Sequence, residues 1–158
     1  MNAAGHTPLP HDAVATMTGL ELMRAMIDGS LPGAPIGALM NMRGVAADHG
    51  TMTFEAIAGP EHYNPLGTVH GGWAATLLDS AMGCAVHTTL SAGTGFTSID
   101  INITYVRAIT AATGPVTARG EVINAGRRVA TVRGTLTDAA GKVLAHGTSS
   151  CLILELPR

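Results

Sequence analysis

The residues whose types and spacing best suit chemistry lie in His70-Gly71-Gly72, which opens a long apolar run. Glycines let the backbone turn tightly and leave its N–H groups unshielded. The first N–H groups of a helix lack partners within the helix, and the helix dipole adds partial positive charge there. A carbonyl oxygen that gains negative charge in a transition state would be stabilised at this position.

A single carboxylate, Asp79, lies inside this apolar run, which continues to His87. As a helix the run is apolar on nearly every side, so we expect it to be buried all round. A carboxylate in such surroundings is costly unless it is paired, hydrogen-bonded or used in a reaction. We interpret Asp79 as a nucleophile or as a general base toward water, in a cleft that a partner surface closes. The alternative is a structural carboxylate that caps a neighbouring loop.

The rest of the chain supplies the elements that must position these groups. Apolar periodicity and capping residues predict a short helix over 20–28 and a central helix over 71–89. Alternation and turn residues predict six strands, over 36–47, 51–58, 96–106, 115–123, 128–136 and 143–154. The short turns between strands join antiparallel neighbours. The predicted fold is therefore α+β, an antiparallel sheet of about six strands wrapped around a long central helix, plus a short N-terminal helix.

Length and composition set the wider limits. With 158 residues, we expect a flexible tail over 1–17 and a single domain over 18–158. Hydrophobic residues make up 46% and charged residues only 13%, so we expect copies of the chain to cover part of its surface. The formal net charge is −2 without a basic run, which argues against nucleic acid as a partner.

The sequence also argues against export and membrane insertion. Its first residues lack the basic start and continuous apolar core of a signal peptide. Asp79 interrupts the best candidate for a membrane span. Two isolated cysteines, Cys84 and Cys151, suit buried thiols in a reducing cytoplasm better than a disulfide framework.

Metal and nucleotide cofactors are not expected. The spacing of His62, His70 and His87 matches no recognised set of metal ligands. The sequence contains no glycine-rich dinucleotide motif, no P-loop and no G-x-S-x-G serine-hydrolase motif. Any catalysis is therefore expected to depend on the side chains and backbone of the chain alone.

A longer pattern surrounds the glycine pair. It consists of Asn64-x5-His70-Gly71-Gly72, then Asp79 in the following helix, then Ser98-x-Asp100-x-Asn102-Ile103-Thr104-Tyr105 on the next strand. This pattern resembles the hotdog-fold acyl-CoA thioesterases, specifically their phenylacetate-degradation (PaaI-like) branch. The resemblance implies a hotdog fold, a homodimer with two active sites at the subunit interface, and frequent doubling to a homotetramer. It also implies an acyl-CoA substrate and no separate cofactor.

The resemblance further assigns roles to individual residues. The residue that matches Gly71 supplies the N–H to the carbonyl oxygen, and the carboxylate that matches Asp79 comes from the neighbouring subunit. The residue that matches Asn64 positions water or the carbonyl, and the one that matches His70 supports the loop and the thioester end. The hydroxyl that matches Ser98 helps to hold the water.

Simpler structural roles remain open for these residues. Asn64 also suits a turn residue before a proline, and His70 suits a loop histidine bonded to its own backbone. The glycine pair, including Gly72 as a candidate substrate contact, also suits tight packing alone. Strand alternation points Ser98 away from the apolar face of its strand, so strand twist or a dimer interface must bring it to the site. Thr97 is the neighbour that could substitute for it.

Candidate contacts for the phosphates of coenzyme A are Arg127 and Arg128, which follow a turn. Adjacent strand residues point to opposite faces, so at most one of them is expected to serve. The alternative is an exposed hairpin charge. Arg107, at the end of another strand, is a weaker candidate.

The acyl group and the reaction class leave alternatives open. The acyl group is aromatic or of medium to long chain, and the stripe of Leu20, Met23 and Ile27 serves packing or lines an acyl pocket. A non-catalytic acyl-CoA-binding hotdog domain is one alternative function. A hotdog enoyl-CoA hydratase or dehydratase is the other, although the pattern from Asn64 to Asp79 fits hydrolysis better.

Overall fold

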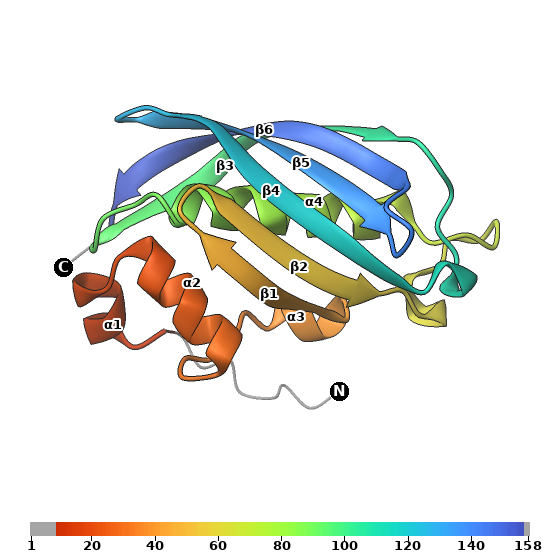
Figure 1. Ribbon diagram of the computed structural model, residues 1–158, viewed down its shortest axis with the longest axis horizontal. Coiled ribbons are helices and arrows are strands. Elements are labelled where there is room, and N and C mark those ends of the chain that lie inside the picture. The colour runs from red at the N-terminus through yellow and green to blue at the C-terminus, as the bar shows by residue number, and fades with distance from the viewer. Residues whose placement is uncertain (1–8, 157–158) are drawn as a thin grey trace.

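A six-stranded antiparallel sheet curves over one long helix, α4 (Gly71–His87), as Figure 1 shows. The structure is a computed structural model and describes residues 9–156. The strands are β1 (Met42–Asp48), β2 (Thr51–Ile57), β3 (Thr94–Tyr105), β4 (Pro115–Ala125), β5 (Val129–Asp138) and β6 (Val143–Glu155). They are ordered β1-β2-β4-β5-β6-β3, which leaves β1 and β3 at the two edges. The predicted α+β architecture is confirmed.

Shorter helices flank the sheet. They are α1 (His11–Thr16), α2 (Gly19–Asp28), α3 (Ile36–Leu39) and the 3₁₀ turns η1 (Pro60–His62) and η2 (Ala111–Thr113). Helix α2 lies beside β1, and α1 and α3 lie near the two ends of α2 (Figure 1). It begins with the predicted capping box, in which Thr18 Oγ1 accepts from Glu21 N–H and the Glu21 carboxylate accepts from Thr18 N–H.

Two expected segments differ in the structure. The strand predicted over 36–47 begins only at Met42, because residues 36–39 form α3. Pro35 has helical backbone angles at the start of α3, and Asn41 has a φ of +48° that separates the helix from the strand. The tail expected over 1–17 contains α1, whose start follows Pro10. The remainder of that expectation, residues 1–8, lies outside the described residues.

Helix α4 forms the centre of the core. Its sheet-facing side chains are completely buried, and they are Leu77, Leu78, Ala81, Met82, Ala85 and Val86. The helix approaches the sheet closely at Gly120 of β4, where a Cβ atom would lie 2.1 Å from the Ala81 carbonyl oxygen. Glycine at this position therefore lets the backbone of the strand and the backbone of the helix come into contact.

One side of α4 is not covered by the sheet, which corrects the expectation of a helix buried all round. Residues on this side are only half-buried, and they are Ala75, Thr76, Asp79, Ser80, Cys84 and His87. They recur every three or four residues, so they form one stripe along the helix. The lone carboxylate belongs to this stripe and not to the fully buried face.

Candidate active site

The start of α4 holds a free backbone donor. His70 caps the helix: its Nδ1 accepts from Gly72 N–H at 2.8 Å, and its carbonyl oxygen accepts from Trp73 N–H at 2.9 Å. Among the residues that the structure describes, none accepts a hydrogen bond from the N–H of Gly71. The first turn therefore leaves the N–H of Gly71 available to an oxygen atom from outside the chain.

The acceptor role of His70 also fixes its tautomer. Because Nδ1 accepts a hydrogen bond, the proton of the neutral ring is on Nε2. The His70 side chain thus serves the helix start, in line with the simpler structural role. The N–H of Gly72 already donates to His70 Nδ1, so it is not available to another acceptor, unlike the N–H of Gly71.

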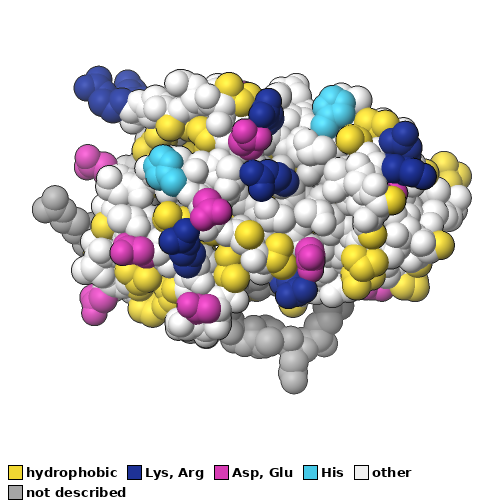
Figure 2. Space-filling view, in the orientation of Figure 1, with side chains coloured by type: hydrophobic (Ala, Val, Ile, Leu, Met, Phe, Trp, Pro, Cys, Tyr) yellow, Lys and Arg dark blue, Asp and Glu magenta, His cyan; other side chains and the backbone are white. Residues whose placement is uncertain are grey.

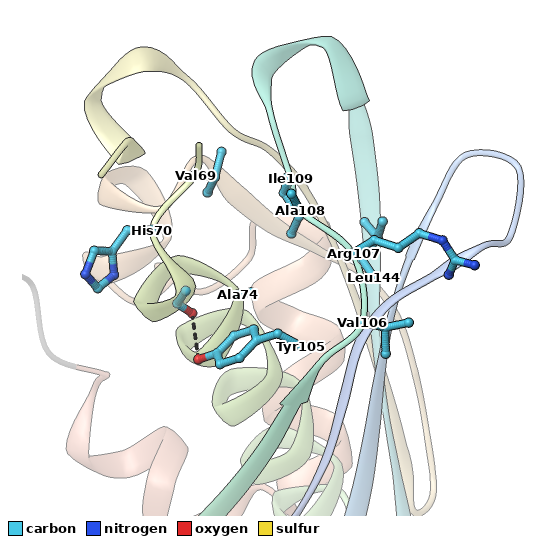
Figure 3. Close-up of a pocket in the computed structure, with 10 residues that line it drawn as sticks. Val69, His70, Ala74, Tyr105, Val106, Arg107, Ala108, Ile109 and Leu144 are labelled. Carbon is cyan, nitrogen blue, oxygen red and sulfur yellow. Dashed lines mark hydrogen bonds between the residues drawn. The ribbon is translucent and has the colours of Figure 1, made fainter. Parts of the chain in front are cut away.

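Tyr105, at the end of β3, lies against the helix start and was not expected to belong to the site. Its hydroxyl donates to the Gly71 carbonyl oxygen at 3.1 Å, the dashed line in Figure 3. A Cβ atom at Gly71 would lie 3.1 Å from Tyr105 Cζ, so glycine allows the ring to sit here. A cavity of about 230 Å³ is lined by His70, Gly71, Tyr105 and Arg107 among other residues. The sequence signal was available, since Tyr105 belongs to the strand pattern.

Asn64 organises the loop before α4. Its Oδ1 accepts from Leu66 N–H at 2.9 Å and from Thr68 N–H at 3.4 Å, and its Nδ2 donates to Thr68 Oγ1 at 2.8 Å. These bonds give Asn64 the turn role that was the simpler alternative. One amide hydrogen remains for another partner, because an NH₂ group has two donors.

The carboxylate of Asp79 has a partner in its own chain. Ser98 Oγ of β3 donates to Asp79 Oδ1 at 2.9 Å. The same carboxylate contributes to the environment of Cys84, one turn further along α4. Burial raises the pKa of the Cys84 thiol to about 12, and the negative charge of Asp79 adds to the rise. A thiol with so high a pKa is a poor nucleophile near neutral pH.

A β-bulge brings Ser98 to Asp79 and corrects the expected direction of that side chain. Ser98 pairs with Cys151 of β6, whereas Asp100 pairs with the adjacent Ser150, so Ile99 has no partner of its own. The bulge is held by the side chains around it. Asp100 Oδ1 accepts from Ser150 N–H at 3.0 Å.

The bulge changes which residues of β3 face the helix. Before it, Phe96 packs beside His87 and Ser98 bonds Asp79, so even-numbered residues face α4. After it, Ile103 packs on the core and Tyr105 reaches Gly71, so odd-numbered residues face α4. A regular strand could not place both Ser98 and Tyr105 on one face, because they are separated by an odd number of residues.

The two chemical groups of α4 are far apart within one chain. Gly71 and Asp79 are separated by eight residues, or about 12 Å along the helix axis. They also border different cavities, because Asp79 and Ser98 line one of about 690 Å³ that does not include Gly71. One chain therefore does not bring its own free N–H to its own carboxylate.

Within one chain, the expected substrate contacts differ in whether they line these cavities. Arg127 and Arg128 lie in the β4–β5 turn and line neither the cavity at Gly71 nor those at Asp79. Thr97 is exposed and alternates with the helix-facing Phe96 and Ser98, so it points away from Asp79. Arg107 does line the cavity at Gly71, with its guanidinium directed away from the helix start in Figure 3.

Comparison with known proteins identifies the family. The family model described as the thioesterase superfamily matches residues 66–145, which contain Gly71, Asp79 and Ser98. The chain belongs to the thioesterase superfamily. Acyl-coenzyme A thioesterase 13 of Homo sapiens is 34% identical over 104 residues, which is 65% of this chain and 73% of the human protein. A thioesterase-superfamily chain with this sheet and central helix has the expected hotdog fold.

Solved structures agree with this assignment. A putative thioesterase from Ralstonia eutropha JMP134, described as phenylacetic acid degradation-related, matches with a TM-score of 0.75 and 26% identity. That match covers 82% of this chain and 98% of the other. A mutant of the phenylacetic acid degradation protein PaaI from Thermus thermophilus matches with a TM-score of 0.68 and 26% identity, over 75% of this chain and 97% of the other. The resemblance to the PaaI-like branch is confirmed.

Proposed function

We propose that this thioesterase-superfamily protein hydrolyses acyl-CoA thioesters to a free acid and coenzyme A. The observation that carries the proposal is the free N–H of Gly71 on the same helix as the Asp79–Ser98 pair. An oxyanion donor and a carboxylate are the two groups that hydrolysis of a thioester needs most. The name of the matching human relative supports acyl-CoA as the substrate.

The active site is composite in this proposal and forms in a homodimer. Strand β3 is a sheet edge of 12 residues, and its Ile99 and Ile101 side chains are 56% and 41% exposed. A second copy that pairs antiparallel along this edge would extend the sheet and set the two α4 helices in opposite directions. Gly71 of one subunit then faces Asp79 of the other, and each dimer contains two sites.

The reaction starts with the thioester carbonyl oxygen on the N–H of Gly71. Asp79 removes a proton from water, and the water oxygen bonds to the carbonyl carbon. The C–S bond then breaks, and the proton held by Asp79 neutralises the coenzyme A thiolate. In the other form of the proposal, Asp79 attacks the carbonyl carbon and the C–S bond breaks to release the coenzyme A thiolate. Water then hydrolyses the resulting anhydride to the free acid and the Asp79 carboxylate, and the thiolate takes up the proton that the water gives up. In both forms the Ser98 hydroxyl donates a hydrogen bond to Asp79 Oδ1, so Oδ2 is the oxygen that reacts.

The remaining residues assist in this scheme. The free amide hydrogen of Asn64 orients water or the carbonyl, and His70 keeps the helix start in place through its bond to Gly72 N–H. Arg107 replaces Arg127 and Arg128 as the first candidate for the coenzyme A phosphates, because it alone lines the cavity at Gly71. No cofactor is required, because the chain supplies both the base and the oxyanion donor.

The assembly and location are further parts of the proposal. The homodimer is the smallest active unit and doubles to a homotetramer, and light scattering measures which mass exists in solution. Two free thiols, Cys84 and Cys151, support a cytoplasmic location. No helix among residues 9–156 is both long and apolar enough to cross a membrane.

Replacement of Asp79 by asparagine tests the function. The wild-type protein is assayed with a panel of aromatic and aliphatic acyl-CoAs for released thiol, and Asp79→Asn is expected to lose about 100-fold or more of kcat, on the order of one general base. Asparagine keeps an oxygen that accepts from Ser98, so the fold and the oligomer are expected to persist. Asp12→Asn, on the exposed first turn of α1, is the matched control. Wild-type turnover by Asp79→Asn would contradict the mechanism, and enoyl-CoA hydration without thiol release would indicate the hydratase instead.

A further inference from the structure

A large cavity lies between α2 and α4, with Asp79 and Ser98 in its wall. Its volume is about 690 Å³. Helix α2 contributes Met23, Met26 and Ile27 to it. The rest of the wall comes from the α2–α3 linker and α3, from β1 and β2, from Ser80 and Cys84 of α4, and from Phe96 of β3. The cavity therefore borders the proposed catalytic carboxylate and extends from it toward the N-terminal helix.

Helix α2 is fixed against the hotdog core at both of its ends. At its start, Gly19 N–H donates to the Leu90 carbonyl oxygen at 3.0 Å. In its middle, Arg24 donates to the Ala47 carbonyl oxygen at 3.1 Å and pairs with Asp48 at 2.9 Å. Near its end, a Cβ atom at Gly44 would lie 3.1 Å from Ile27 Cγ1, so the helix touches β1 directly. The helix is a rigid wall of the cavity.

The chemistry of the wall is apolar along its length and polar only near the carboxylate. The larger apolar side chains of the lining include Met23, Met26, Ile27, Ile36, Met42, Met52, Phe54 and Phe96. Apart from Asp79, the charged residue of the lining is Arg43, and its guanidinium pairs with Glu55 at 2.7 Å on the exposed outer side. No charge in the cavity is thus left to bind a polar end of an acyl group. Methionine side chains adapt their shape to flexible or irregular apolar ligands.

We propose that this cavity binds the acyl group of the substrate, that it selects apolar acyl groups much larger than acetyl, and that Met26 of α2 sets their upper length. This inference rests on the proposed function. The volume lies within the range of roughly 300–1,000 Å³ that holds ligands of drug size, and an acetyl group would leave most of it empty. The carbonyl end of the acyl group lies at Asp79, and its far end meets α2.

The apolar cavity predicts how kcat/KM depends on the length of the acyl chain. Each methylene that enters an apolar cavity gains about fourfold in affinity or in kcat/KM. We expect kcat/KM for straight-chain acyl-CoAs to rise by about that factor per carbon and then to stop rising when the chain reaches α2. A polar or charged group at the far end of the acyl chain is expected to cancel the gain.

The experiment compares Met26→Trp with Met26→Ala over a series of straight-chain acyl-CoAs. Tryptophan fills the far end of the cavity, so the longest efficiently hydrolysed chain becomes shorter and the ratio of kcat/KM for long over short chains falls at least tenfold. Alanine opens the cavity, so the optimum moves to longer chains. Met17→Trp is the matched control, because Met17 packs on the core but does not line this cavity. Melting temperatures check that each variant is folded.

A second measurement separates this inference from the proposed function. Titration calorimetry with the free straight-chain acids measures binding in the cavity without any hydrolysis. If no acyl-CoA is hydrolysed but acid binding weakens with Met26→Trp for long chains only, the proposed function fails and the cavity assignment stands. If hydrolysis occurs and Met26→Trp and Met26→Ala leave the length profile unchanged, or change all lengths equally, the cavity assignment is overturned and the proposed function stands.

Discussion

At the scale of single residues, Asp100 helps to hold the bulge that brings Ser98 to the carboxylate of Asp79. Its Oδ1 accepts from Ser150 N–H at 3.0 Å, and its carbonyl oxygen accepts from the hydroxyl of the buried Ser149 at 2.7 Å. Both bonds hold β3 to β6 next to the unpaired Ile99. In the proposed mechanism, Asp100 would therefore position Asp79 through the bulge and through Ser98.

Substitution of Asp100 tests this role. Asp100→Ala removes the acceptor for Ser150 N–H, so the bulge loosens and kcat is expected to fall about tenfold or more. Loss of one hydrogen bond is expected to lower the free energy of unfolding by only about 1 kcal/mol. Asp100→Asn keeps an acceptor oxygen and is expected to restore kcat to near the wild-type value. Equal losses of activity in both variants would mean that activity depends on the charge of Asp100 and not on its hydrogen bond with Ser150 N–H.

At the scale of elements, the close contact between β4 and α4 depends on Gly120. A Cβ atom there would lie 2.1 Å from the Ala81 carbonyl oxygen and 2.8 Å from Met82 N, and both are backbone atoms that cannot rotate away. We expect Gly120→Ala to lower the free energy of unfolding by about 1–3 kcal/mol, the usual cost of overpacking. Urea denaturation measures the change. Gly33→Ala is the control, since nothing lies within 4 Å of its added methyl group. An unchanged free energy of unfolding in Gly120→Ala would contradict the packing of α4 on this strand.

The C-terminal end of α4 gives a pH dependence of stability. Burial lowers the pKa of His87, and its Nε2 atom has no hydrogen-bond partner among the described residues. The unfolded chain, with a histidine pKa of about 6.5, then binds the proton more readily than the folded chain. The free energy of unfolding should therefore fall as the pH drops below about 6.5, by at most about 1.4 kcal/mol per pH unit.

Denaturation at a series of pH values tests the contribution of His87. His87→Leu is expected to flatten the decline between about pH 6.5 and the lowered pKa, because the group that takes up the proton on unfolding is gone. His49→Leu, at an exposed position, is the control and should keep the wild-type slope. If the two variants show the same slope as the wild type, His87 does not account for the decline.

At the scale of the whole molecule, the proposed function requires two subunits to share each active site, and mixed dimers test this. Gly71→Pro removes the proposed oxyanion N–H, and proline suits the first position of a helix after an extended residue such as His70. Gly71→Ala keeps the N–H but brings the same Cβ atom close to Tyr105, so it is the control for crowding. Each of Gly71→Pro and Asp79→Asn alone is expected to be inactive. Co-expressed together, they form one intact site in each mixed dimer, so activity should return to about a quarter of the wild-type value. Light scattering and melting curves check assembly and folding.

The mixed dimers distinguish the two arrangements of the site. If Gly71 and Asp79 of the same chain acted together, no combination of the two variants would contain an intact site, and activity would stay absent. Retention of activity by Gly71→Pro alone would instead remove the backbone donor from the mechanism.

Much of this protein follows from the sequence because it depends on neighbours along the chain. The capping box at Thr18, the helix start at His70-Gly71-Gly72 and the apolar run with its single Asp79 are local patterns, and each is found where it was predicted. The α+β class follows as well, since short turns and alternating strands permit few arrangements around one apolar helix. The strand expected over 36–47 is shorter than predicted, because Pro35 starts a short helix before β1.

The tertiary structure decided what depends on pairing between distant segments. Alternation along β3 pointed Ser98 away from the apolar face, and only the pairing with β6 produces the bulge that turns it to Asp79. The contact of Tyr105 with Gly71 follows from the same bulge. The cavity under α2 likewise needs two helices that are far apart in sequence to lie side by side. Figure 2 shows hydrophobic side chains scattered among charged ones on the face in view. A local pattern determines which face a residue prefers, whereas a single unpaired residue in a sheet reverses that preference for everything beyond it.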